Sequence, residues 1–274
     1  MTGAKPVVRP QAAKRSLLPS YAAPPVNEVV VGLIFEPVLA MRIPHTGLFW
    51  SRVKDKFPKC EHAPPFAFEN AWNDQSSGLP LPRVWLIGPN EDELIQLQND
   101  RIYFNWRQTD KEETYPRYIA VRGKFKDVIA EFNNFLQEIF SAALVPRSCE
   151  LSYINVIRKG HGWSSAGDLG GLFTDFHWVK RDNRFLPDPD RSNWAASFNM
   201  PNGLGRMDVQ TQFAKRKSDQ AEIIRLELTA RGLGEQKDLA AAWRWYDVGH
   251  EWIVKGFADL TQMYVQNTYW KRTE

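Results

Sequence analysis

Histidines and acidic residues that lie close together in the sequence are the first candidates for chemistry. Asp175 and His177 are two positions apart, and His161 and Asp168 precede them in a glycine-rich segment. An aspartate beside a histidine can do general-base work, and glycine lets a ligand come close to the backbone. A polar surface loop has the same composition, and it is the simpler interpretation of this segment.

Metal-ligand spacing is weak in this chain. Cys60 and His62 form a Cys-x-His pair with no second pair to complete a site, and Asp188 and Asp190 lie in a Pro-Asp sequence typical of turns. The sequence HEWIV (250–254) begins like a zinc-binding helix but lacks the second histidine one turn later. We therefore predict no metal and no cofactor.

His250 has a second interpretation, as a core residue. It falls on an apolar stripe of a helix predicted over 238–267, together with Trp243, Tyr246 and Ile253. This position predicts a buried histidine whose polar atoms are satisfied within the core.

Strand alternation separates a second group of candidates. In RIYFNWR (101–107), Ile102, Phe104 and Trp106 point to one face and are predicted to be core. The intervening residues and their counterparts in 221–232 point to the opposite face, where we expect a polar recognition surface. The candidate binding residues are Tyr103, Asn105, Arg107, Arg225, Glu227 and Arg231.

Charge is concentrated at the start of the chain. The net charge is +3, but Lys5, Arg9, Lys14 and Arg15 all precede the first acid, and without them the remaining charge is close to zero. Five prolines and little apolar periodicity predict that residues 1–24 form a disordered basic arm. Such an arm can hold nucleic acid weakly through its four basic residues.

The chain's two cysteines, Cys60 and Cys149, allow no disulfide framework, which favours a reducing compartment. No apolar run approaches the roughly 20 residues that a membrane helix needs. We expect a cytoplasmic protein with no membrane association.

The predicted elements define an α+β fold. The first half contains a strand (27–38), a helix (46–57), strands at 83–88, 93–98, 101–107 and 117–123, and a helix (125–140). The second half contains a strand (150–159), a short helix or loop (164–176), strands at 193–200, 206–216 and 221–232, and the helix 238–267. This order predicts two tandem β-α-β(3-4)-α units, 25–146 and 147–274, with antiparallel sheets and the element order of TBP-like repeats.

Several short motifs carry a resemblance to a known family. They are PPVNEVV (24–30), NWR (105–107), YPRY (115–118), LELTARG (226–232) and HE (250–251). The chain resembles a sporadically distributed family of uncharacterised bacterial proteins over roughly residues 24–266. The resemblance implies no catalytic residues, because no activity is assigned to that family.

Three functional hypotheses follow. The first is a non-catalytic binding or regulatory protein with a protein partner, in a bacterial accessory system such as a defence or toxin–antitoxin locus. The second is an enzyme with a site between the 161–177 loop and the second sheet. The third is a nucleic-acid-binding module. A deep pocket where the loop meets the sheet would favour the enzyme.

Overall fold

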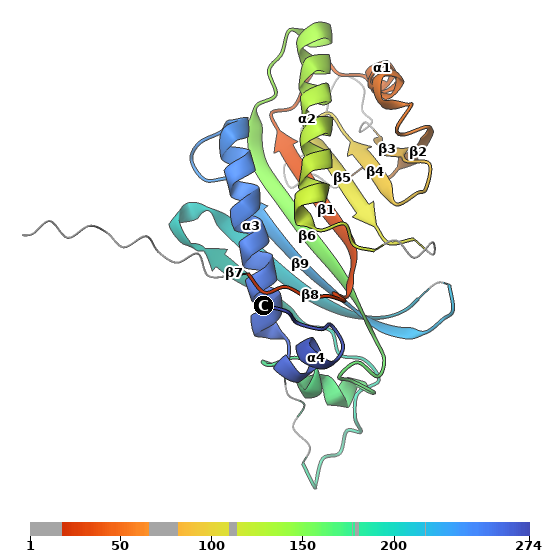
Figure 1. Cartoon of the computed structure of the whole chain (residues 1–274), viewed down its shortest axis with the longest axis vertical. Helices are drawn as coiled ribbons and strands as arrows, with labels where there is room; N and C mark the ends of the chain where they lie inside the picture. Colours follow the sequence, from red (N-terminus) through yellow and green to blue (C-terminus); the bar gives the residue numbers. More distant parts are fainter. Residues whose placement is uncertain (1–17, 66–81, 110–113, 177, 179–180, 217) are drawn as a thin grey trace, which may run out of the picture.

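One continuous antiparallel sheet organises the chain (Figure 1). The computed structural model describes residues 18–65, 82–109, 114–176, 178, 181–216 and 218–274. Within these ranges the nine strands have the order β2-β3-β4-β5-β1-β6-β9-β8-β7. They are β1 (Val26–Phe35), β2 (Lys59–Ala63), β3 (Arg83–Ile87), β4 (Glu93–Leu97), β5 (Arg101–Arg107), β6 (Pro146–Arg158), β7 (Ala195–Met200), β8 (Gly205–Lys215) and β9 (Glu222–Gly232).

Two long helices lie side by side on one face of this sheet, α2 (Tyr118–Phe140) and α3 (Leu239–Leu260) (Figure 1). The shorter helical elements are α1 (Ile43–Val53), α4 (Met263–Thr268), η1 (Ala166–Gly171) and η2 (Pro201–Gly203). The long helices contact each other through the Phe125 ring, which meets the Tyr246 ring edge-on at 5.8 Å between centroids.

The prediction of two tandem units with their own sheets was wrong. β1 pairs with β6 along almost its whole length, with Val29 opposite Tyr153 and Val31 opposite Leu151. On its other edge β1 continues into β5, β4, β3 and β2, and β6 continues into β9, β8 and β7. The pairing of β1 with β6 therefore joins both halves into one sheet. The join leaves no exposed edge at the centre of the molecule, where an unpaired strand would be a site of aggregation.

The helix-facing side of the sheet is the core. Ile102, Phe104 and Trp106 of β5 are all at most 3% exposed on this side, which confirms their predicted role. The apolar stripe of α2, from Phe125 to Leu136, packs against them. Burial of aromatic and aliphatic side chains at this density is the main stabilising term in a fold of this size.

Two helix boundaries differ from the sequence prediction. The segment 117–123, predicted as a strand, is the first part of α2, where Tyr118, Val121 and Phe125 recur on the buried side at helical spacing. The predicted helix 238–267 is broken at Thr261, whose backbone is extended (φ −115°, ψ 145°) between α3 and α4. The strand β2 has no counterpart among the predicted elements, and its side chains are largely exposed.

A segment near the N-terminus is ordered against the C-terminal residues. Ala22 N–H donates to Lys271 O at 2.9 Å, and Thr273 N–H donates to Ser20 O at 2.8 Å. The Tyr21 side chain is buried and its hydroxyl donates to Gln266 at 3.0 Å. We call residues 18–25 and 270–274 the terminal strap.

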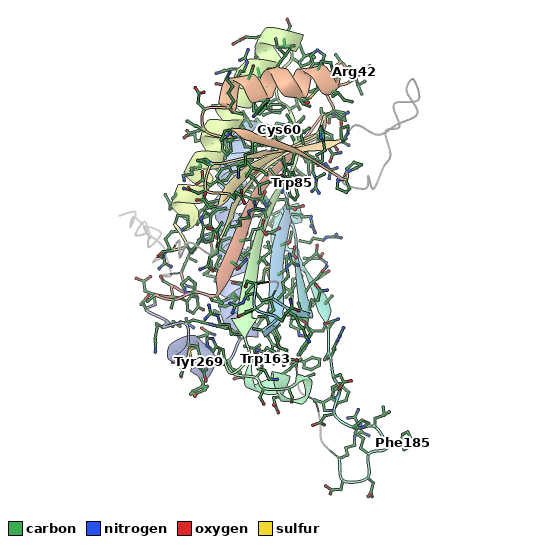
Figure 2. The ribbon with its side chains drawn as sticks, turned by 90° about the vertical axis from the view of Figure 1, so that its right-hand side faces the viewer. Arg42, Cys60, Trp85, Trp163, Phe185 and Tyr269 are labelled. Carbon is green, nitrogen blue, oxygen red and sulfur yellow. The ribbon has the colours of Figure 1, made fainter. Side chains whose placement is uncertain are left out.

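The strap differs from the predicted arm, which extended to residue 24. The remaining part of that arm, including Lys5, Arg9, Lys14 and Arg15, lies outside the described residues. Among the helices that are described, none is long and apolar enough to cross a membrane. Figure 2 shows a loop carrying Phe185, which is 97% exposed, projecting from one end of the molecule.

Candidate functional site

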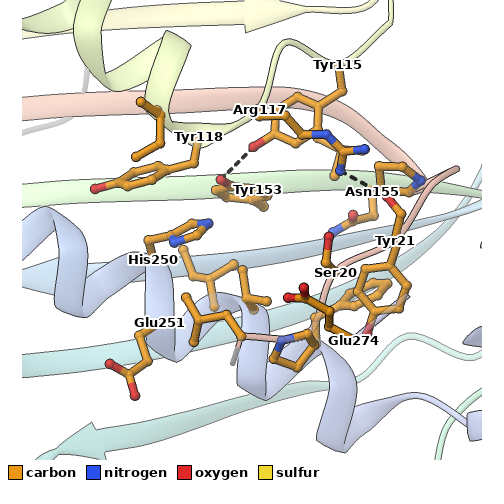
Figure 3. A pocket seen from close by; sticks show the side chains of 18 of the residues that line it. Ser20, Tyr21, Tyr115, Arg117, Tyr118, Tyr153, Asn155, His250, Glu251 and Glu274 are labelled. Atoms are coloured by element: carbon orange, nitrogen blue, oxygen red, sulfur yellow. Dashed lines mark hydrogen bonds between the residues drawn. The ribbon is translucent and has the colours of Figure 1, made fainter. Parts of the chain in front are cut away.

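A cavity of about 850 Å³ lies between the first turn of α2, the middle of α3 and the terminal strap (Figure 3). Its volume is within the range of about 300–1,000 Å³ that small-molecule sites occupy. Three sequence segments far apart in the chain converge on it: YPRY (115–118), HE (250–251) and the two prolines of PPVNEVV. The residues with polar side chains that line it are Ser20, Tyr21, Tyr115, Arg117, Tyr118, Tyr153, Asn155, Asp247, His250, Glu251 and Glu274.

The floor of the cavity is β6, which contributes Tyr153 and Asn155 from its helix-facing side. Asn155 is only 2% exposed and interrupts the apolar pattern of this face, where its neighbours across the strands are Val26 and Leu226. Its amide Nδ2 donates to Leu226 O at 3.2 Å, but no group in the described part of the chain donates to its Oδ1. A buried acceptor in a cavity therefore has capacity for a ligand or water.

Tyr115 and Tyr153 form a hydroxyl pair above this floor, with their oxygens 2.8 Å apart. Two phenols carry two protons, and only one can lie between the two oxygens. The other proton has no acceptor among the described residues. Burial raises the pKa of Tyr115 to about 12 and that of Tyr153 well above its usual value, so both keep their protons near neutral pH.

The first turn of α2 forms one rim. Arg117 precedes the helix with a backbone conformation (φ 74°, ψ 155°) that is rare for a residue with a side chain. Its guanidinium donates to Tyr21 O at 2.9 Å and lies 5.8 Å from the centre of the Tyr115 ring. No side chain caps the helix, so its first backbone N–H groups have no acceptor within the helix.

His250 lies on α3 and stacks flat on the Tyr118 ring, with 3.9 Å between the ring centroids and 7° between the planes. Burial lowers its pKa to about 4, although the nearby Asp247 and Glu251 carboxylates act in the opposite direction. Neither ring nitrogen hydrogen-bonds to any residue that the structure describes. The predicted satisfied core histidine is therefore wrong: His250 is a neutral imidazole at the cavity wall with unused hydrogen-bonding capacity.

Two acids at the rim are neutralised locally. Asp247 accepts from the Tyr118 hydroxyl at 3.0 Å and from Arg122 at 3.3 Å. Glu251 pairs with Lys255 one turn along α3 and points away from the cavity (Figure 3). Neither carboxylate is therefore expected to set the electrostatic potential inside the cavity.

The low pKa of His250 predicts an acid-sensitive component of stability. This histidine titrates near 6.5 when unfolded and near 4 when folded, so between these values the unfolded state binds more protons. Its contribution is fully present above pH 6.5, and we expect it to fall by about 2–3 kcal/mol as the pH drops toward 4. Denaturant titrations at pH 7 and pH 4.5 measure this loss.

His250→Leu provides the control for that experiment, because it keeps an apolar side chain on the stripe and cannot be protonated. We expect the variant to lose less stability than the wild type between the two pH values, since all other acids titrate in both proteins. Equal losses would mean that His250 titrates normally in the folded state.

The predicted recognition surface of β5 is largely covered. Tyr103 and Asn105 do lie on the face away from the long helices, but they are 3% and 4% exposed. Asn105 accepts from Gln96 at 2.7 Å and donates to Glu28 at 2.6 Å, in a chain of side-chain hydrogen bonds across the sheet. Arg107 donates to the Glu91 carbonyl at 2.6 Å.

The three candidates of β9 lie on the same face and are paired. Arg225 forms an ion pair with Glu227 at 2.6 Å. Arg231 bridges Glu150 at 2.6 Å and Asp208 at 3.0 Å on the two neighbouring strands. None of the six predicted binding residues lines the cavity of Figure 3.

In the described part of the chain, the 161–177 loop lines neither of the two hollows together with the predicted β9 site residues. Part of it lines a shallow hollow of about 530 Å³, together with Trp178 and Tyr269 but without any of the β9 candidates. His161 stacks on Tyr269 at 4.5 Å, Asp168 accepts from Ser164 and Ser165, and Asp175 is exposed. His177 lies outside the described residues.

The weak metal candidates stay separate. Cys60, His62, Asp188 and Asp190 are all exposed. Over the described ranges, no group of three or more His, Cys, Asp or Glu side chains is close enough to hold an ion.

Comparison with known proteins identifies no relative: no family model, no curated protein and no solved structure matches the chain. The functional argument therefore depends on the geometry of the cavity.

Proposed function

We propose that this is a non-catalytic binding protein that holds a small organic ligand in the cavity between α2, α3 and the terminal strap. The observation that carries the proposal is the set of unused hydrogen-bonding groups in a partly enclosed space: the Asn155 Oδ1, one proton of the Tyr115–Tyr153 pair and the ring nitrogens of His250. These groups are open to the cavity and have no partner among the described residues, so a ligand in the cavity could pair with them.

The protonation states favour binding over catalysis. A general acid or base works best with a pKa near the working pH. The tyrosines have raised pKa values and His250 has a pKa lowered to about 4, so all three stay neutral at pH 7. Neutral, fixed donors and acceptors are suited to recognising a ligand. Ser20, the one serine, threonine or cysteine among the described residues that line the cavity, is not hydrogen-bonded to a base through its hydroxyl.

The proposal predicts a ligand that copurifies with the protein or is found by screening. Protein isolated from its native host would be denatured, and the released small molecules identified by mass spectrometry. In parallel, a metabolite library would be screened for compounds that raise Tm. We expect a compound bound at one equivalent, because the unused groups belong to one cavity.

Matched variants locate the ligand. Tyr153→Phe with Asn155→Leu removes two polar groups of the cavity, and we expect roughly tenfold or greater loss of affinity. Tyr264→Phe with Asn267→Leu makes the same chemical changes at exposed positions of α4 and should bind normally. A compound that binds both double variants equally must bind outside the cavity. The proposal is contradicted if neither approach finds a bound compound.

A further inference from the structure

We infer that the ligand is an amphipathic anion: a carboxylate or phosphate-ester head at Arg117, a hydroxyl or amide donor beside the head, and an apolar chain. This inference rests on the proposed function and specifies the ligand's chemistry. It comes from three parts of the cavity, which differ in the kind of group they can accept.

The head is assigned to the rim formed by the start of α2. This helix is 23 residues long and has no side-chain cap, so the N–H groups of Tyr118, Ile119 and Ala120 have no internal acceptor and favour an anion. Arg117 uses one of its five N–H donors on Tyr21 O. The Arg117 guanidinium lies 5.8 Å from the centre of the Tyr115 ring, whose hydroxyl pairs with that of Tyr153.

The backbone of Arg117 supports this assignment. Its conformation is unfavourable for a residue other than glycine, and the hydrogen bond to Tyr21 O and the contact with Tyr115 hold it in place. Such strain is typical of residues that clamp a ligand.

The acids of the cavity restrict where an anion can lie. Asp247 is neutralised by Tyr118 and Arg122, and Glu251 pairs with Lys255. Glu274 lies on the strap side, near Ser20 (Figure 3). An anion would be repelled there, which leaves the Arg117 end as the only favourable place for the head among the described groups.

Asn155 supplies an independent requirement. Its side chain is 98% buried, lines the cavity and has an Oδ1 that accepts from no described group. It lies two positions after Tyr153 on the same face of β6, so the two side chains are about 6–7 Å apart along the strand. A ligand donor next to the head, such as a hydroxyl or an amide N–H, would satisfy it.

The rest of the wall is apolar and suits a hydrocarbon chain. It is formed by α3 and the strap, and its members are Leu18, Pro19, Pro25, Ile253, Val254 and Phe257. A chain along this wall would gain about 25 cal/mol for each Å² of apolar surface removed from water.

Thermal shift with four matched probes tests the inference: 3-hydroxydecanoate, decyl phosphate, decanol and decylamine, each below its micelle concentration. At about 100 times Kd, we expect 3-hydroxydecanoate, decyl phosphate or both to raise Tm by roughly 5 °C or more. Plain decanoate, which lacks the hydroxyl as decyl phosphate does, is compared with decyl phosphate to identify the head as carboxylate or phosphate. Decanol and decylamine should give much smaller shifts.

Variants tie the effect to the rim. Arg117→Gln should lower the affinity for the better anionic probe by about 10- to 100-fold. Arg117→Lys should retain part of that affinity. Arg244→Gln, at an exposed position of α3 outside the cavity, is the control and should bind normally. Asn155→Leu should abolish the preference for 3-hydroxydecanoate over plain decanoate. The unliganded Tm of each variant reports on its fold.

The outcomes separate the two proposals. The inference of an anionic head is wrong if decanol or decylamine raises Tm as much as the anionic probes do. It is also wrong if Arg117→Gln binds the anionic probes normally. In both cases the cavity remains a ligand site. If no probe raises Tm, the amphipathic anion is wrong, and a copurifying compound of other chemistry would still support the proposed function.

Discussion

Trp106→Ala is expected to lower the free energy of unfolding by about 3–5 kcal/mol, which is the usual cost of removing a large buried aromatic side chain. Trp106 is 3% exposed on the helix-facing side of β5, and its ring lies 5.4 Å from that of Tyr115. Part of this loss comes from the apolar area that is no longer buried. The rest comes from the cavity left behind, which the surrounding strands cannot fill. Equilibrium denaturation in urea measures it.

The same variant should also disturb the ligand cavity. Tyr115 packs between Trp106 and Tyr153, whose ring is 6.1 Å away, so a missing indole removes the support for the hydroxyl pair. Trp106→Phe keeps an aromatic ring at this position and should cost much less. A loss below about 1 kcal/mol for the alanine variant would contradict the core assignment.

The sequence predicted much of the local structure, because alternation and helical spacing are local signals. The buried and polar sides of β5 were assigned correctly from the order of residues alone. What alternation cannot predict is whether the second side of a strand is open to solvent. Asn105 is buried there because Gln96 and Glu28, from two other strands, satisfy its amide.

The single sheet could not be derived from such patterns. Both β1 and β6 read as ordinary strands, and their pairing connects residues more than 100 positions apart. A long-range pairing of this kind depends on which strand edges meet, and each half contains several edges of similar character. The element order was compatible with one sheet or two.

The cavity was also beyond local reasoning, although its parts were visible. YPRY and HE were noted as motifs, but their convergence required that 117–123 begin a helix instead of a strand. One signal was available: Asn155 is a polar residue on the otherwise apolar face of a strand, alternating with Leu151, Tyr153 and Ile157. A polar residue at such a position costs free energy unless something pairs with it.

Tyr103 owes its burial to a glycine on the neighbouring strand, and this leads to the second large effect. Gly32 lies directly opposite Tyr103, and a Cβ atom built on it would be 2.1 Å from the tyrosine Cδ1. The backbone of Gly32 is not in the left-handed region, so its requirement for glycine is steric. We expect Gly32→Ala to destabilise the fold by about 3 kcal/mol, as overpacking in a close-packed region does.

A double-variant cycle tests whether the clash with Tyr103 is the cause. Tyr103→Ala removes the ring that meets the new Cβ, and in that background Gly32→Ala should be neutral or slightly stabilising, because alanine costs less entropy than glycine in a strand. The two substitutions would then be strongly non-additive in urea denaturation. If the losses of unfolding free energy from the two substitutions add, Gly32 is required for a reason other than Tyr103. The tyrosine ring could then move outward to avoid the new Cβ.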